Sequence, residues 1–244
     1  MTPEERRITK IAKDWSKDKA NVQHVLRQLV GGEDYSTLQR PAAVFMAGSP
    51  GAGKTEVAKD VLGAFDPKPV RVDADDFRTM MPGYDGKNAH LFQEAATSMV
   101  QKVLDRIYDS GKSGSPVPFI LDGTFTYART MDNLKRALNH GYAIDIFYVY
   151  QRPELAWSFT KARELREGRI VPKDVFVRTF LQARANVIEA KKIFGERVKL
   201  SVIIKNTDAT DLETHAYIAA ADLERIIPRK YNEDELRLAL ENDN

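Results

Sequence analysis

The residues best suited to chemistry form one glycine-rich segment, Gly48 to Thr55, with the sequence GSPGAGKT. It matches G-x-x-x-x-G-K-[ST], in which glycines let successive backbone N–H groups point at phosphate oxygens. Lys54 would reach the β- and γ-phosphates, and the Thr55 hydroxyl would ligate magnesium. An apolar run precedes the segment and a helix-like stretch follows it, as the pattern requires. We predict a nucleoside triphosphate site made of Gly48, Ser49, Pro50, Gly51, Ala52, Gly53, Lys54, Thr55 and Glu56.

Acidic residues follow the next two predicted strands. Asp73 and Asp75 come after the second strand, and Asp122 comes after the third. Because the carboxyl ends of parallel strands meet at one edge of a sheet, these side chains are expected beside the glycine-rich loop. A hydroxyl that accepts phosphate needs a carboxylate to take its proton, and magnesium needs a further carboxylate, directly or through water. Asp75 and Asp122 are predicted to serve these two purposes. Helix capping is the alternative for Asp73 and, more strongly, for Asp76.

Arginines are dense further along the chain, in FTKARELREGRIVPKD. Such runs are usually solvated helix faces. This run meets Gly168 at a predicted helix end, and Ile170-Val171-Pro172 then restarts the chain, which indicates a corner like a lid. Guanidinium groups on a lid would neutralise phosphate charge during transfer and exclude water. Spacing alone leaves the solvated face and the lid equally open.

Short apolar runs alternate with helical patterns over most of the chain. Strands are expected at 42–47, 70–72, 118–121, 143–150 and 198–204, the last alternating like an outer strand, and helices at 89–109, 129–139, 153–168, 173–194 and 211–227. Strands that alternate with helices of this length form βαβ units and a mainly parallel sheet. The expected fold is α/β, a P-loop NTPase-like three-layer α/β/α sandwich with about five strands and an N-terminal helical extension.

Two helices are expected within residues 1–40. Thr2-Pro3-Glu4-Glu5 is a capping box, and an apolar stripe runs along each helix before Gly31-Gly32. These stripes fit a buttress packed on the main domain, and they also fit a regulatory lid that covers the nucleotide site in cis. The segment GGEDYSTLQRP is the expected linker. The expected organisation is a helical extension at 1–40, a catalytic domain at 41–227 and a charged tail at 228–244 that forms at most a short surface helix.

Composition excludes several classes of protein and site. The chain has 244 residues and a net charge of +2, from 37 basic and 35 acidic residues. This balance argues against nucleic acid as a partner, because phosphate backbones need basic grooves. The absence of cysteine excludes disulfides and thiolate metal sites, and it fits a reducing cytosol. No apolar run approaches the ~20 residues that span a bilayer, and the charged N-terminus is unlike a signal peptide. We expect a cytoplasmic protein without membrane association.

With these segments placed, residues 42–206 resemble the zeta toxin family, P-loop kinases of bacterial toxin–antitoxin systems. GSPGAGKT is similar to the family's phosphate loop, and VRVDADDFRTMMPGY is similar to the segment that carries its catalytic base. ILDGTFTYAR resembles its substrate-contacting segment, and FTKARELREGRIVPKD resembles its arginine-bearing lid. The phosphate loop is shared by the whole superfamily, so the D-x-D-x-F…P spacing and the arginine–proline corner carry the resemblance.

The resemblance implies transfer of phosphate from ATP or GTP, with Mg²⁺, to the 3′-hydroxyl of the amino sugar in UDP-N-acetylglucosamine. Such transfer blocks cell-wall synthesis, and an antitoxin protein would hold it off. The implied catalytic residues are the base Asp75 with Lys54, Arg163 and Arg169 at the γ-phosphate. The implied substrate-binding residues are Asp75, Phe77, Gln101, Asp122, Thr124 and Thr126. Thr55 is the implied magnesium ligand, with Asp122 acting through water.

Three positions depart from the family pattern. Asp122 stands where the family usually has glutamate, Thr126 replaces an arginine, and Gln101 lies near a position where some members carry an acidic substrate ligand. The segment between Arg163 and Arg169 is also short for the lid. Because these departures concern the acceptor and the lid, a kinase of the same fold with another acceptor stays open (nicotinamide dinucleotide, another nucleotide sugar or an antibiotic). A nucleotide-gated binding or switch module without transfer is the alternative from another class.

Overall fold

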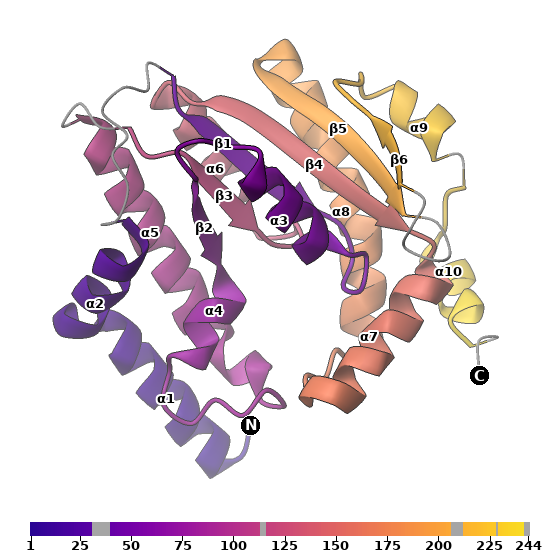
Figure 1. Cartoon of the computed structure of the whole chain (residues 1–244). Coiled ribbons are helices and arrows are strands. Elements are labelled where there is room, and N and C mark those ends of the chain that lie inside the picture. The colour runs from indigo at the N-terminus through magenta and orange to yellow at the C-terminus, as the bar shows by residue number, and fades with distance from the viewer. Residues whose placement is uncertain (31–39, 113–115, 206–211, 228, 242–244) are drawn as a thin grey trace.

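A six-stranded sheet organises the part of the chain that the computed structural model describes, which is residues 1–30, 40–112, 116–205, 212–227 and 229–241 (Figure 1). Its strand order is β2-β3-β1-β4-β5-β6, parallel except for β6, which pairs antiparallel with β5. The expected α/β fold with a mainly parallel sheet is confirmed. The strands are β1 (Ala42–Ala47), β2 (Val70–Asp73), β3 (Phe119–Asp122), β4 (Ala143–Gln151), β5 (Val198–Lys205) and β6 (Leu212–His215).

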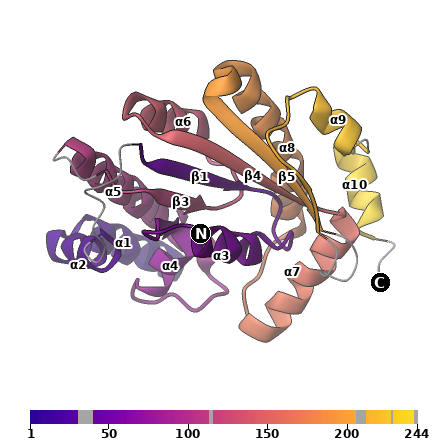
Figure 2. The same cartoon turned by 45° about the horizontal axis from the view of Figure 1, so that its top comes forward.

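Helices cover both faces of the sheet (Figure 2). Side chains alternate across a strand, so β1 sends Phe45 into the core beneath α5, α6 and α8 and sends Met46 into a second core beneath α3. The helices are α1 (Pro3–Lys17), α2 (Lys19–Val30), α3 (Lys54–Gly63), α4 (Ala74–Thr79), α5 (Gln93–Lys112), α6 (Thr130–Asn139), α7 (Pro153–Glu167), α8 (Lys173–Phe194), α9 (Asp222–Ile226) and α10 (Glu233–Ala239), with 3₁₀ turns η1 (Ala89–Phe92) and η2 (Gly195–Arg197).

The N-terminal helices pack on the main core. The predicted capping box forms, with the Thr2 hydroxyl oxygen accepting from the Glu5 N–H at 3.1 Å. Helix α1 contacts α5 and η1, and α2 contacts α5 and β2. Ala12 and Val25 are fully buried in the same core as the sheet. Both helices are therefore attached to the main core of the protein. Most of the predicted linker, residues 31–39, lies outside the described residues.

The sequence prediction was wrong after β5. In place of one helix over 211–227, the described residues form the strand β6 and the short helix α9. β6 pairs with β5, with Val202 opposite His215, so β5 is not the outer strand. The strand forms because the free backbone edge of β5 gains a hydrogen-bonding partner there.

The charged C-terminal segment forms the short helix α10, most of whose residues are exposed, and one face of this helix packs on the main domain. Leu236 of α10 is fully buried against Phe176 and Phe180 of α8 and against Ala156 of α7. Helix α10 therefore helps to hold the start of α7, the helix whose far end carries the arginines. Among the described residues, no helix combines the length and apolar character needed to cross a lipid bilayer.

Candidate active site

The glycine-rich loop joins β1 to α3 in a conformation that needs glycine. Gly48, Gly51 and Gly53 have φ of 140°, 73° and 84°. Gly53 is the N-cap of α3, and no side chain caps the first N–H groups of that helix. The loop amides and the positive end of the helix dipole are therefore available to an anion.

The loop is seated tightly against the neighbouring elements. A Cβ atom on Gly51 would lie 2.0 Å from the carbonyl oxygen of Ala156 in α7. A Cβ atom on Gly48 would lie 2.4 Å from the carbonyl oxygen of Val149 in β4. Real side chains cannot approach backbone so closely, so both glycines are required by packing as well as by backbone angle.

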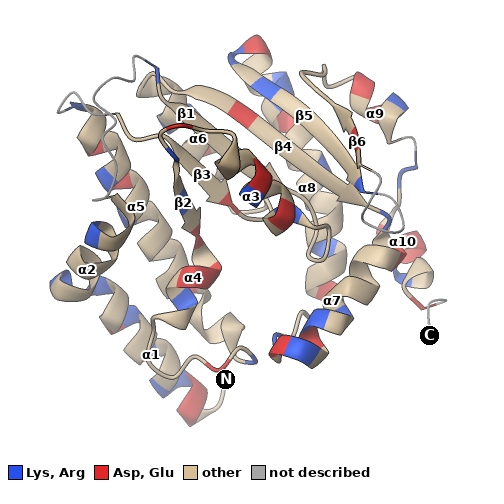
Figure 3. Cartoon of the chain, viewed as in Figure 1, with Lys and Arg blue, Asp and Glu red and all other residues tan. Residues whose placement is uncertain are grey.

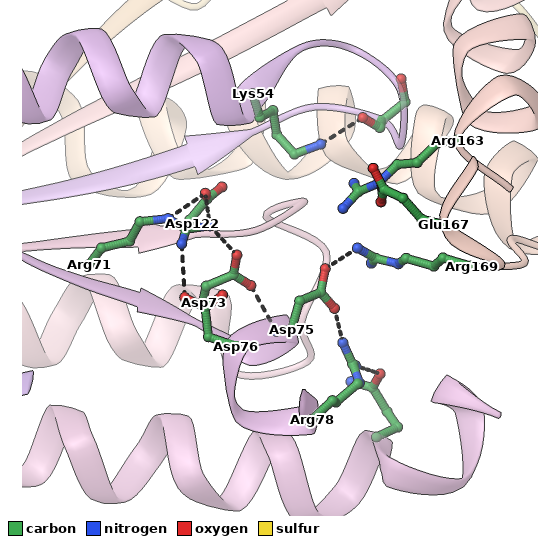
Figure 4. Close-up of polar contacts among 12 residues, drawn as sticks. Lys54, Arg71, Asp73, Asp75, Asp76, Arg78, Asp122, Arg163, Glu167 and Arg169 are labelled. Atoms are coloured by element: carbon green, nitrogen blue, oxygen red, sulfur yellow. Dashed lines mark hydrogen bonds and ion pairs between the residues drawn. The ribbon is translucent and has the colours of Figure 1, made fainter. Parts of the chain in front are cut away.

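Lys54 turns back across the loop. Its Nζ donates a hydrogen bond to the carbonyl oxygen of Ser49 at 2.6 Å (Figure 4). Desolvation lowers the pKa of Lys54 to about 8, although the nearby carboxylates of Asp122, Asp75 and Asp73 act in the opposite direction. The ammonium group is thus mainly protonated at neutral pH and within electrostatic reach of the acidic residues across the site.

Asp75 lies at the start of α4, at the same edge of the sheet as the loop. Asp73 is the N-cap of this helix, and its Oδ1 accepts from the Asp75 N–H at 2.8 Å. The two carboxylate oxygens of Asp75 are bound separately, Oδ1 by Arg78 and Oδ2 by Arg169 (Figure 4). Both partners are guanidinium groups, so Asp75 is held by charge-assisted bonds from two sides.

Asp73 and Asp122 end adjacent strands in direct register. Arg71 offsets this pairing of like charges: it forms an ion pair with Asp73, and it donates to Asp122 Oδ2 from Nε at 3.1 Å and from Nη2 at 3.0 Å. Burial, and next to it the charge of Asp75, raise the pKa of Asp73 to about 7. Asp76 pairs with Arg71 Nη1 at 2.8 Å, so its predicted role as a helix cap belongs to Asp73.

The arginine-rich corner reaches this acidic cluster. Helix α7 ends at Gly168, whose φ of 72° turns the chain. Figure 3 shows acidic and basic residues crowded at this end of α7. Arg163 donates to Glu167 at 2.5 Å. Arg169 itself contacts Asp75, so the structure brings the arginine corner and the predicted base together.

The loop after β3 lies beside the glycine-rich loop. The N–H of Gly48 donates to the carbonyl oxygen of Thr124 at 3.4 Å. The hydroxyls of Thr124 and Thr126 are 2.7 Å apart. Between them Phe125 has a φ of 64°, and its carbonyl oxygen accepts from Asn186 of α8 at 2.8 Å. A defined loop thus presents two hydroxyls near the loop that would hold phosphate.

Two predicted substrate-binding residues have other surroundings. Phe77 is fully buried in the main core, because it faces the packed side of α4. Gln101 lies on α5 and accepts from Arg136 of α6 at 3.0 Å. Arg136 also pairs with Asp105 and stacks over Tyr108. This hydrogen bond places the Gln101 amide in the α5–α6 interface and does not join it to the carboxylate cluster.

Three basic residues at the site were missed by sequence reasoning. Arg71 shares a strand face with Asp73, two residues on, and this spacing was a usable signal. Arg78 follows Asp75 by one helical turn, which was a second signal. Lys205 ends β5; a Cβ on Gly53 would lie 2.3 Å from its Nζ, and Nζ is 3.8 Å from Glu56. Nothing in the local sequence indicates that contact.

The residues present fit a nucleoside triphosphate. The loop supplies N–H donors, Lys54 supplies a desolvated cation, and the Thr55 residue is exposed at the first turn of α3. Among the described residues no group of three or more His, Cys, Asp or Glu side chains could hold a metal ion. Magnesium in such sites takes much of its coordination from phosphates and water, so a single hydroxyl with one carboxylate nearby is compatible with it.

The chain is similar to several known proteins. A model of the zeta toxin family matches residues 28–215. The toxin PezT of Streptococcus pneumoniae serotype 4 is 27% identical over 195 residues, which cover 72% of this chain and 73% of PezT. A structure of the PezAT chromosomal toxin–antitoxin system of Streptococcus pneumoniae aligns with a TM-score of 0.65 and 18% identity, covering 100% of this chain and 95% of the other. The AvrRxo1-ORF1:-ORF2 complex with ATP aligns with a TM-score of 0.63 and 14% identity, covering 100% and 86%.

Proposed function

The chain belongs to the zeta toxin family, and from this premise we propose that it is a kinase that moves the γ-phosphate of ATP or GTP to a hydroxyl group. The first candidate acceptor is the 3′-hydroxyl of the amino sugar in UDP-N-acetylglucosamine, and the physiological effect would be a toxin's block of cell-wall synthesis. In this proposal residues 41–227 are the kinase domain and residues 1–40 its helical extension.

One observation carries the proposal. Asp75 lies at the same sheet edge as the phosphate loop, within electrostatic reach of Lys54, and in contact with Arg169. A base, a cation for the β- and γ-phosphates and a guanidinium for the transferred group are the three parts that phosphoryl transfer to a hydroxyl requires. A binding or switch module has no need of the carboxylate facing the phosphate loop.

The proposed steps follow from these positions. The loop amides from Gly51 to Thr55 hold the β-phosphate, and Lys54 bridges the β- and γ-phosphates. Arg163 and Arg169 bind the γ-phosphate, and Asp75 takes the proton of the acceptor hydroxyl. The hydroxyl oxygen bonds to phosphorus as the bond from phosphorus to the leaving β-phosphate oxygen breaks. The proton then leaves Asp75 for solvent. Magnesium, held by the Thr55 hydroxyl and through water by Asp122, would neutralise charge on the phosphates.

The acceptor is the finer part of the proposal. Thr124 and Thr126 present hydroxyls beside the loop, and Asp122 is fixed by Arg71, which gives a sugar three oxygen partners. Against this, Gln101 is engaged by Arg136. That contact, with the departures at Asp122 and Thr126, favours testing a kinase with another acceptor as the second candidate.

A labelled-phosphate assay tests the function. Purified protein is incubated with γ-labelled ATP, Mg²⁺ and a panel of UDP-sugars, nicotinamide dinucleotides and antibiotics, beside Asp75→Asn. We expect label on UDP-N-acetylglucosamine that depends on Asp75. Label on a different panel member would replace the acceptor and keep the kinase. No labelled product from the panel or from a metabolite extract would leave the switch module as the better account.

We also propose an antitoxin as partner, because the related PezT belongs to a toxin–antitoxin system. The contacts of α1 and α2 with α5 support a buttress rather than a lid in cis. Deleting residues 1–30 separates the two, since loss of a buttress exposes the core surface on which Ala12 and Val25 pack and gives insoluble protein. A soluble and more active product would instead favour inhibition in cis.

A further inference from the structure

A second arginine, Arg78, binds the carboxylate of the proposed base Asp75. Arg78 lies one turn after Asp75 on α4, and its Nη1 donates to Asp75 Oδ1. Arg169 binds the other oxygen, Oδ2. The two arginines have different settings, because the side chain of Arg78 is 8% exposed whereas that of Arg169 is 26% exposed and stands on the corner after α7. Arg78 is built into the fold beside the base.

A chain of hydrogen bonds also holds the guanidinium group of Arg78 through its second terminal nitrogen, Nη2. Its Nη2 donates to Oε1 of Gln93, the first residue of α5, at 2.5 Å (Figure 4). Gln93 Nε2 in turn donates to the Thr97 hydroxyl at 3.3 Å, and that hydroxyl donates to the Gln93 carbonyl oxygen at 2.8 Å. Helices α4 and α5 pack together, so two elements set the plane of the guanidinium. A side chain held in this way can orient its partner at little further entropic cost.

We infer that Arg78 is a positioning residue that presents Oδ2 of Asp75 to the acceptor hydroxyl. The inference rests on the proposed kinase function. When Arg169 binds the γ-phosphate, Oδ2 loses its partner while Oδ1 stays with Arg78. The oxygen that takes the proton is therefore Oδ2. Arg78 is buried and acts through Asp75, and Gln93 acts through Arg78.

The charge setting supports this assignment. The Asp73 carboxylate accepts a hydrogen bond from the Asp75 N–H, and Asp122 lies opposite Asp73 on the neighbouring strand β3. Arg71 is shared among Asp73, Asp76 and Asp122. Arg78 lies on the same helix as Asp75. Within the described part of the chain, Arg78 forms an ion pair with Asp75 alone. Removing it would leave Arg169 as the remaining cation on Asp75, so the carboxylate would be free to rotate once Arg169 binds the γ-phosphate.

A double-mutant cycle tests the inference. The variants are Arg78→Met, Arg78→Lys and Gln93→Leu, each with and without Asp75→Asn, and the exposed Arg106→Met of α5 as matched control. Arg78→Met should lower kcat about 10- to 100-fold with KM for either substrate changed less than about twofold. In the Asp75→Asn background it should cause less than about a twofold further loss, because the two residues act as one unit. Arg78→Lys should restore part of kcat, and Gln93→Leu should give an intermediate loss.

Two outcomes of the kinetic cycle would overturn it. An equal loss from Arg78→Met with and without Asp75 would show an independent role, and a raised acceptor KM with unchanged kcat would make Arg78 a substrate-binding residue. A fluorescent ATP analogue confirms that each variant still folds and binds nucleotide. Independently of turnover, the side-chain carboxyl ¹³C resonance of Asp75, assigned by its loss in Asp75→Asn, should shift in Arg78→Met and stay in Arg106→Met. An unshifted resonance in Arg78→Met would also overturn the inference. If the resonance shifts but the wild-type protein has no kinase activity, only the proposed function is contradicted.

Discussion

Arg169, just beyond α7, forms an ion pair with Asp75, at the start of α4. This contact joins the arginine corner to the carboxylate that we propose as base. The Asp75 carboxylate and a bound γ-phosphate would therefore compete for the Arg169 guanidinium. Binding of nucleotide would then free the base as it recruits the arginine.

Replacing Arg169 should separate transfer from folding. Arg169→Ala is expected to lower kcat about 10²- to 10³-fold, because a preorganised cation for the transferred phosphate is lost. Arg166→Ala is the matched control, since Arg166 is exposed and pairs with Glu167. Steady-state kinetics on both variants check this. Equal kinetics for the two variants would remove Arg169 from the site.

Lys54→Met should lose nucleotide binding and gain stability. Desolvation lowers the pKa of Lys54 from 10.5 to about 8, so the unfolded chain binds more protons than the folded chain between those pH values. The contribution of this group to the free energy of unfolding therefore rises with pH from about 8 to about 10.5, and at pH 7 its full penalty is present. Removing the charge should raise the free energy of unfolding at pH 7 by about 1–2 kcal/mol, less the lost bond to Ser49. Urea unfolding at pH 7 checks the sign, with the exposed Lys59→Met as control; a less stable Lys54→Met would contradict it.

Asp73→Asn should stabilise the chain in a pH-dependent way. Burial raises the pKa of Asp73 from 3.8 to about 7, so the folded chain binds more protons than the unfolded chain between these values. Its contribution to stability is complete below about pH 4 and is lost as the pH rises through 7. Asparagine still caps α4 and carries no charge. The variant should exceed wild type by about 1–3 kcal/mol at pH 8 and by much less at pH 4. A larger advantage at pH 4 would show the opposite shift.

Gly51→Ala tests the close packing of the glycine-rich loop against α7. The added Cβ would lie 2.0 Å from the Ala156 carbonyl oxygen at a φ of 73°, so the loop and α7 must move apart. We expect a loss of about 1–3 kcal/mol of stability and a large loss of nucleotide affinity. Gly63→Ala is the control, because a Cβ atom added there would meet nothing within 4 Å; it should be neutral or stabilising by about 0.5–1 kcal/mol. Thermal unfolding and nucleotide titration of both variants decide the matter, and equal behaviour would refute the packing argument.

Local patterns predicted much of the fold. The helix at 173–194 has the predicted bounds, because a long amphipathic stripe between Pro172 and Gly195 leaves few alternatives. The segment 212–227 was misread because its apolar residues fit a helical period, whereas pairing with the edge of β5 decided its structure. Local period cannot show which edge of a sheet remains unpaired.

In the candidate site, too, some features were predictable from local sequence and others depend on how separate elements pack. The position of the glycine-rich loop was predictable because its residues are consecutive, and the position of Asp75 at the same edge was predictable because strand ends meet there. The pairs Arg78–Gln93 and Arg169–Asp75 depend on how separate elements pack, which no local pattern encodes. The burial of Phe77 was not predicted, because its place in the motif does not show that a helix beside the site also needs an anchor in the core.

The most direct test of the central claim compares Asp75→Asn with Asp76→Asn in one phosphate-transfer assay. Asp76 is the next residue, and its carboxylate pairs with Arg71. If Asp75 takes the acceptor proton, Asp75→Asn should lower kcat about 10²- to 10⁴-fold while nucleotide affinity is kept, and Asp76→Asn should stay close to wild type. An Asp75→Asn protein that transfers phosphate at the wild-type rate would contradict the account.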